Sequence, residues 1–315
     1  MVERVVGVSG ELHTGRAAVG YGMVASAAAL FAVNGTVSKV ILKSGITAQQ
    51  LTEVRCAGAL LGLVLLAVLT RPGSLRVRVT DLPLLVALGV GGLALVQWSY
   101  FYAIDRLDIG IALLIQFVGP ILVALWAKLV FGEQVRRRIW LALALALGGL
   151  TLIVEVWRGG RLSGAGLAAA GVAAITYATY ILLAEHGVRR RDPVSLSAWG
   201  FFFATAFWSV VAPWWHYPAA RLGDHVSLLG NLHSSHLPVV ALMAWMIVLG
   251  TIAPFLLVVG ALGRISATRA GITGMLEPVV AIVVAWAWLG ESLDAVQLSG
   301  ATLTLAGISL ALTSR

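Results

Sequence analysis

The chain has 315 residues, of which 59% are apolar and 11% are charged, and its mean hydropathy is +0.94. These values lie far from those of soluble domains and exclude both a soluble enzyme and a disordered chain. The apolar runs lack the alternation of apolar and polar residues that is typical of membrane barrel strands. A helix of about 20 apolar residues is long enough to cross a bilayer. One cysteine, Cys56, excludes a disulfide framework. The sequence therefore predicts an all-α membrane protein.

Ten transmembrane helices are predicted in chain order. Residues 1–20 mix charged with weakly apolar residues and lack the features of a signal peptide, which predicts a cytoplasmic N-terminal tail. The spans follow at about residues 21–41, 51–69, 82–104, 109–131, 140–156, 167–184, 194–214, 238–262, 268–289 and 296–312.

The ten spans fall into two related halves. The segment Ala112–Glu133 aligns with Ala270–Glu291 at an offset of 158 positions, and both end in Gly-Glu after a proline. The matched pairs are Ala112 and Ala270, Pro120 and Pro278, Gly132 and Gly290, Glu133 and Glu291, and Gly149 and Gly307. Such self-similarity predicts an internal duplication. We expect a first five-helix repeat at 21–156, a linker at 157–166 and a second repeat at 167–313.

Five spans in each repeat place the second repeat in the membrane upside down relative to the first. Fourteen Lys and Arg residues fall in one set of alternate loops and five in the other. Because cytoplasmic loops hold the excess, both termini are predicted to be cytoplasmic, in a multi-pass protein of the inner or plasma membrane. The formal charge of +8 is thus explained by topology and predicts no nucleic-acid partner.

These features resemble the EamA-type transporters of the drug/metabolite transporter superfamily. The resemblance covers about residues 21–312, and its most specific part is Pro278–Glu291, PVVAIVVAWAWLGE. Arg55 fits a position where the family often has arginine, whereas Asn34 and Gly35 replace the usual Trp-Gly. The resemblance implies a basket of helices around a central cavity. It also implies that small metabolites, amino acids or toxic compounds are moved mostly outward.

Glu277 is the strongest candidate for a functional residue, because it lies midway along the ninth span. A carboxylate costs about 2.5–3.5 kcal/mol at the bilayer centre, so its presence there indicates a task. It could bind a cationic group of the substrate or carry a proton. Alternatively, it could tether helices by pairing with Arg55 or Lys39.

Three prolines within spans are candidate helix kinks: Pro120, Pro278 and Pro254. Each removes one backbone hydrogen bond and frees the carbonyl four residues earlier, at Gln116, Gly274 and Gly250. Transporter sites commonly form where paired spans are interrupted at corresponding positions, although proline is also ordinary in membrane helices.

Other polar residues within the spans are expected to face the bundle interior. The predicted substrate-binding or coupling residues, in addition to Glu277, are Asn34, Lys39, Gln97, Tyr100, Gln116, Tyr177 and Tyr180. Lys39 and Arg55 lie near the outer ends of their helices, so they are expected to extend to the membrane interface; the alternative is a positive vestibule for carboxylates.

The prediction for function is a secondary transporter that exports a small metabolite, such as an amino acid, by alternating access. No nucleotide-binding motif occurs, so a gradient or exchange must supply the energy, with a proton as the default coupling ion. The predicted partners are a small-molecule substrate and the lipid bilayer, for a monomer or homodimer without cofactor or metal. The alternatives are an intramembrane enzyme and a non-transporting membrane scaffold. The polar residues are scattered over many spans, whereas an enzyme needs them clustered at one depth, and a scaffold would be expected to have a sizeable soluble module, which is not seen.

Overall fold

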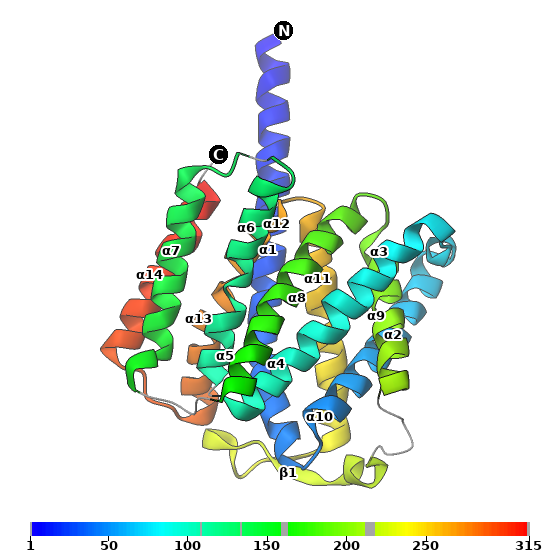
Figure 1. Cartoon of the computed structure of the whole chain (residues 1–315), viewed down its shortest axis with the longest axis vertical. Helices are drawn as coiled ribbons and strands as arrows, with labels where there is room; N and C mark the ends of the chain where they lie inside the picture. The colour runs from blue at the N-terminus through cyan, green and yellow to red at the C-terminus, as the bar shows by residue number, and fades with distance from the viewer. Residues whose placement is uncertain (1, 108, 133, 159–162, 212–217, 314–315) are drawn as a thin grey trace.

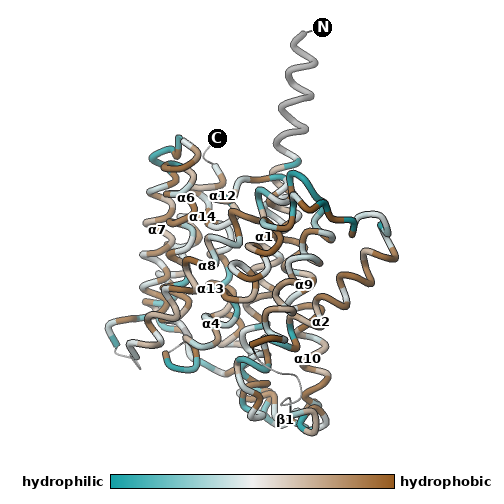
Figure 2. Tube along the Cα trace, turned by 45° about the vertical axis from the view of Figure 1, so that its right-hand side comes forward, coloured by the Kyte–Doolittle hydropathy of each residue, from teal (hydrophilic) through white to brown (hydrophobic). Residues whose placement is uncertain are grey.

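The computed structural model describes residues 2–107, 109–132, 134–158, 163–211 and 218–313. Within these parts, ten helical segments are long and apolar enough to cross a membrane. This confirms the predicted all-α membrane fold. The first segment enters the bundle and the last leaves it at the same end of the molecule (Figure 1). Figure 2 shows hydrophobic residues along the spans and hydrophilic residues gathered toward the two ends.

The first repeat forms the spans one to five. Its helices are α1 Val2–Lys43, α2 Ala48–Thr70, α3 Leu82–Val86, the π-helical turn η3 Ala87–Ala94, α4 Leu95–Arg106, α5 Ile109–Gln116, α6 Gly119–Leu129 and α7 Arg137–Val154. Helix α2 begins with a capping box, in which Thr47 and Gln50 each satisfy a backbone N–H of the other. Helix α1 already begins at Val2, so the predicted tail is helical from that residue, and its cytoplasmic location stays a prediction.

The second repeat forms spans six to ten. Its helices are α8 Gly164–Val188, α9 Pro193–Val211, α10 Val239–Ile247, the π-helical turn η8 Val248–Ile252, α11 Ala253–Leu262, α12 Ala267–Gly274, α13 Leu276–Val284, the π-helical turn η9 Ala285–Leu289 and α14 Ala295–Thr313. Span nine ends at Gly290, whose φ of +73° is the left-handed conformation that favours glycine. Glu133, the partner of Glu291 in the duplication, lies outside the described residues.

Short elements fill the connections. The two strands β1 His225–Ser227 and β2 His236–Pro238 pair antiparallel, with Val226 opposite Leu237. Single helical turns complete the loops: η1 Pro72–Leu75, η2 Val79–Asp81, η4 Val156–Arg158, η6 Ala219–Gly223 and η7 Gly230–Leu232. The hairpin lies at the end of the bundle opposite the entry of α1 (Figure 1).

Helices α7 and α14, the last of each repeat, pack along a seam of small residues. A Cβ added at Gly149 would come within 2.6 Å of Thr304 N, and one added at Gly307 would come within 2.8 Å of Ala146 N. Ala146 and Thr304 are themselves related by the offset of 158, and the Thr304 hydroxyl donates to the Ala146 carbonyl. Each repeat therefore offers the same surface to the other, as in a two-fold symmetric contact.

Candidate functional site

A central cavity of about 130 Å³ lies between the two repeats. Its walls come from α1, α2, α4 and α5 of the first repeat and from α8, α11, α12 and α13 of the second. Most of these helices contribute residues from the middle of their spans. The cavity thus has the location in which membrane transporters built from inverted repeats bind their solutes.

The structure brings seven of the eight predicted substrate-binding or coupling residues to this cavity. They are Asn34, Gln97, Tyr100, Gln116, Tyr177, Tyr180 and Glu277. Lys39 is the exception: it does not line the cavity, and its side chain is partly exposed. The reason is helical geometry, since adjacent residues point about 100° apart and Ser38 occupies the cavity-facing position.

Several polar atoms at the cavity have no hydrogen-bond partner among the described residues. Buried unpartnered atoms include Asn34 Oδ1, Gln97 Oε1, Gln116 Oε1 and the Tyr180 hydroxyl. Buried polar groups in proteins nearly always bond to protein, ordered water or ligand. Three of these four atoms are amide oxygens, which accept hydrogen bonds. The cavity therefore has the capacity to bind a hydrogen-bond donor.

Glu277 lies on the cavity wall at a break in span nine. Helix α12 ends at Gly274 and α13 begins at Leu276, with Pro278 in its first turn. The side chain of Glu277 forms no hydrogen bond or ion pair within the part of the chain that the structure describes. No direct ion pair joins it to Arg55 or Lys39 in this conformation, although Arg55 lines the same cavity and interacts with the carboxylate through its charge.

Arg55 is a correction to the sequence analysis. Instead of extending to the membrane interface, its side chain is buried, with 5% exposed, and lines the cavity. Its Nε donates to Thr251 Oγ1 and its Nη2 donates to the Gly250 carbonyl, both at 2.7 Å. Pro254 lacks the N–H that this carbonyl would otherwise accept. The freed carbonyl was predictable from the sequence, but the arginine that satisfies it was not.

The first repeat is interrupted at the position that corresponds to the break in span nine. Helix α5 ends at Gln116 and α6 begins at Gly119, with Pro120 as the second helical residue. Gln116 and its duplicate position, Gly274, both line the cavity. Pro254 lies near the start of α11, directly after the π-helical turn η8. Three of the spans that line the cavity therefore have an interruption in their α-helix.

Aromatic rings shape the rest of the wall. Tyr180 and Phe255 meet edge to face with their centroids 5.4 Å apart, and Phe31 meets Phe255 in the same way. Tyr177 packs against Gly119, where an added Cβ would lie 2.7 Å from its ring. Phe31 and Phe255 were not among the predicted residues, because one apolar residue in an apolar span carries no signal of which way it faces. The wall combines apolar faces with a few polar groups, as solute sites usually do.

Comparison with known proteins identifies the relationship of this chain. The sequence profile described as the EamA-like transporter family matches residues 18–155 and 164–313. The chain belongs to the EamA-like transporter family. The two matches correspond to two copies of one unit, in agreement with the duplication. The family is one of transporters, so this chain is a multi-pass membrane transporter for a small molecule.

Individual members of the family agree with this assignment. The threonine/homoserine exporter RhtA of Salmonella typhimurium is 29% identical over 241 residues, which are 76% of this chain and 74% of RhtA. The pseudopaline exporter CntI of Pseudomonas aeruginosa is 28% identical over 119 residues, or 38% of this chain and 42% of CntI. A solved crystal structure with 17% identity superposes with a TM-score of 0.72 over 94% of this chain and 96% of its own. That structure supports the fold alone.

Proposed function

We propose that this EamA-like transporter exports a small amino-acid-like metabolite across the cytoplasmic membrane by alternating access. The observation that carries the proposal is the central cavity, which is lined both by the cation Arg55 and by the anion Glu277. It is also lined by amide oxygens that have no hydrogen-bond partner among the described residues. RhtA and CntI, both named as exporters, support outward transport of a metabolite. In this proposal both termini face the cytoplasm.

The charges of the cavity match a compound with both an amine and a carboxylate. Arg55 uses two of its five N–H donors on Thr251 and Gly250, which leaves donors for a substrate carboxylate. Glu277 and the amide oxygen of Gln116 both line this cavity, and both can accept hydrogen bonds from the ammonium group of the solute. A solute that satisfies these groups replaces the water that would otherwise hydrate them.

Glu277 supplies a way to couple transport to protons. A carboxylate holds either a proton or a substrate ammonium, so binding one displaces the other. If the empty carrier returns with Glu277 protonated, export of one substrate molecule accompanies import of one proton. The paired breaks before Pro120 and Pro278 let the two repeats change their tilt without unfolding the flanking helices.

Transport in proteoliposomes tests this function. A counterflow screen of amino acids and amines is run with wild type, Glu277→Gln and a matched control, Glu291→Gln. Glu291 is exposed at the end of the same span, so its substitution removes the same charge away from the cavity. We expect Glu277→Gln to lower uptake about tenfold or more and to abolish the response to a proton gradient. Wild-type rates and pH response in Glu277→Gln contradict the assignment.

A further inference from the structure

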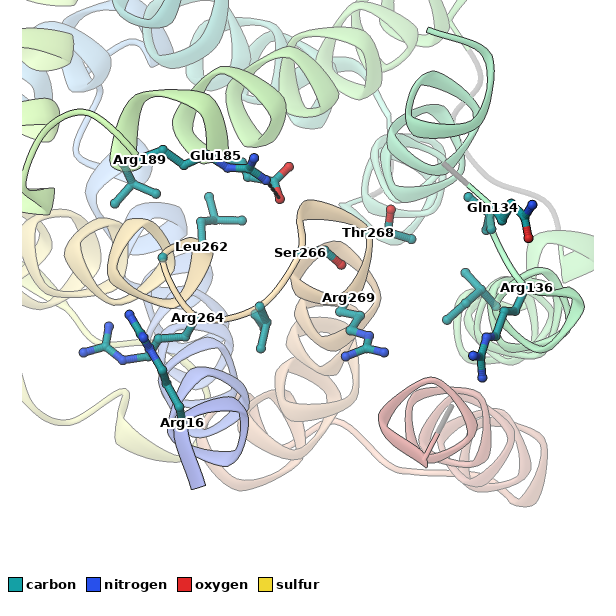
Figure 3. Close-up of a pocket in the computed structure, with 15 residues that line it drawn as sticks. Arg16, Gln134, Arg136, Glu185, Arg189, Leu262, Arg264, Ser266, Thr268 and Arg269 are labelled. Carbon is teal, nitrogen blue, oxygen red and sulfur yellow. Dashed lines mark hydrogen bonds and ion pairs between the residues drawn. The ribbon is translucent and has the colours of Figure 1, made fainter. Parts of the chain in front are cut away.

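A second pocket, of about 780 Å³, lies at the end of the bundle where α1 enters. Its residues come from α1, the start of α7, the end of α8 and the turn between α11 and α12 (Figure 3). Five of them are arginines: Arg16, Arg136, Arg189, Arg264 and Arg269. Glu185 is the one acidic residue among the described residues that line it. The pocket therefore concentrates positive charge.

Internal pairing leaves much of this charge uncompensated. Arg189 lies 3.4 Å from Glu185, and Arg264 donates to the Gly260 carbonyl of its own helix. Arg16 and Arg136 are exposed and form no ion pair within the described part of the chain. Cations that share one pocket repel each other, and an anion bound between them attracts each of them and so offsets this repulsion. Guanidinium groups favour phosphate because their planar forks donate two parallel hydrogen bonds.

Two helix N-termini add to the positive potential. Helix α7 begins after Arg136 and α12 begins after Ser266, and both of these cap residues line the pocket. Neither cap side chain accepts a hydrogen bond from the first turn of its helix. Among the described residues, the N–H groups of Arg137 and Ala267, the first of each helix, have no hydrogen-bond partner, and the helix dipoles favour an anion at the same place.

The pocket is separate from the central cavity. The two share no lining residue, although both lie along α1, α8, α11 and α12. Val24 on the wall of the cavity and Leu262 on the wall of the pocket belong to one core cluster of buried apolar residues. Arg136 comes from the first repeat, Arg16 from the part of α1 that precedes this repeat, and the other three arginines from the second repeat. A ligand in the pocket would therefore contact the ends of both repeats.

We propose that this arginine pocket binds a phosphate group and thereby holds the two repeats together at this end. In either case the ligand is a phosphate group whose oxygens accept hydrogen bonds from the guanidinium groups. The phosphate belongs to the headgroup of an anionic lipid or to a soluble phosphate compound. Basic pockets between membrane helices bind anionic headgroups in this manner. The proposal concerns binding alone and stands whether or not the exported substrate is amino-acid-like.

A second basic pocket at the same end provides a matched control. It is lined by four arginines, but Arg191 there lies 3.0 Å from Asp81 and donates to the Ser74 and Arg76 carbonyls. Its two aspartates, Asp81 and Asp192, offset half of its four arginine charges. The test variant is Arg16→Gln with Arg136→Gln, and the control is Arg76→Gln with Arg78→Gln, which removes the same charge from exposed positions.

Binding is measured on the purified full chain in two arms. In neutral detergent, pyrophosphate is titrated and the unfolding temperature is followed, which detects a soluble ligand. In the other arm, nanodiscs of phosphatidylglycerol or phosphatidylcholine are compared, and retained lipids are counted by native mass spectrometry. Saturable binding in the first arm identifies a soluble phosphate. Retention of phosphatidylglycerol in the second arm identifies a lipid.

We expect the test variant to weaken phosphate binding about tenfold or more in whichever arm shows it, and the control to change it less than about twofold. Arg136→Gln alone should give an intermediate loss and guards against misfolding of the double variant. The proposal is overturned if neither arm shows saturable binding, or if test and control variants behave alike. It is also overturned if the test variant raises the KM for the exported substrate while phosphate and lipid binding are unchanged, because the arginines then form a substrate vestibule.

Discussion

The seam between α7 and α14 and the central cavity show opposite outcomes of one duplication. At the seam, equivalent positions make equivalent contacts: Gly149 meets Thr304, and Gly307 meets Ala146. At the cavity, equivalent positions differ: Glu277 corresponds to Gly119, and Gln116 corresponds to Gly274. The first region preserves symmetry in packing, whereas the second has lost it in chemistry.

The difference follows from what each region must do. Two helices in lipid have no hydrophobic force between them, so close backbone approach at small residues holds them together. Any bulky residue on either side disrupts that contact, which keeps both copies alike. A site for an asymmetric solute needs different protein groups to bind the two ends of that solute. The cavity therefore carries one carboxylate and one guanidinium rather than two of each.

The largest expected effect comes from removing Arg55, the cation of the asymmetric region. In Arg55→Leu, the buried carbonyl of Gly250 loses its donor, which costs about 1–3 kcal/mol. We expect transport to fall about tenfold or more and the unfolding temperature in detergent to fall as well. Arg55→Lys keeps the charge but not both hydrogen bonds, so it should recover part of the transport activity and part of the unfolding temperature. Full transport by Arg55→Leu would remove Arg55 from the site.

The next effect tests the symmetry of the seam directly. Gly149→Ala and Gly307→Ala each place a Cβ against the backbone of the partner helix, and each should destabilise the protein by about 1–3 kcal/mol. The matched control is Gly148→Ala, whose Cβ would lie 3.8 Å from Leu303 and should be neutral. Thermal unfolding in one detergent measures all three. Unequal losses for Gly149 and Gly307 would break the symmetric description.

A smaller effect of mixed sign is expected at Gln116. Its amide oxygen is buried without a partner, so Gln116→Leu removes an unsatisfied group and should leave the unfolding temperature unchanged or slightly higher. Transport should nevertheless decrease, by about threefold to tenfold, because the cavity loses an acceptor. A decrease in stability with unchanged transport would show that Gln116 serves packing, as the glycines of the seam do.

The smallest effect concerns Asp294, in the loop between η9 and α14, which contacts Arg158 at the end of the first repeat. Its Oδ1 accepts from the Gln297 N–H, which lowers the pKa of the carboxyl, and its Oδ2 lies 2.6 Å from Arg158. Because the pKa is lower in the folded state, this stabilisation is present at neutral pH and is lost as pH falls through the folded pKa. Asp294→Asn should lower the unfolding temperature by about a degree or two near pH 7 and converge with wild type in acid. Parallel pH curves would contradict it.

The symmetric features were the ones that the sequence predicted best. Ten apolar runs and an offset that aligns Pro120 with Pro278 predict the spans, the duplication and the breaks near the cavity. Polar residues in the middle of spans, such as Glu277, also had to face the interior, because hydrocarbon leaves them no other stable place. These inferences need only the period of a helix and the cost of exposing polar groups to lipid.

The features that were missed depend on which way a helix is rotated and on distant contacts. Lys39 was placed at the site although its neighbour Ser38 faces the cavity, and a difference of one residue decides between the two. Arg55 reaches a carbonyl almost two hundred positions away, at Gly250, which no local pattern reveals. The arginine pocket likewise combines four regions that are far apart in the chain.

Accessibility of the cavity to water from both sides tests the central claim most directly. Gly35 lines the cavity, and a Cβ added there meets no described atom within 4 Å. Gly35→Cys, made with Cys56→Ala, is treated with a membrane-impermeant thiol reagent in right-side-out and in inverted vesicles, with Gly171→Cys on α8 as control. We predict labelling of Gly35→Cys from both sides, slowed by substrate, and none of the control. Labelling from neither side, or from one side only under all conditions, would contradict alternating access to this cavity.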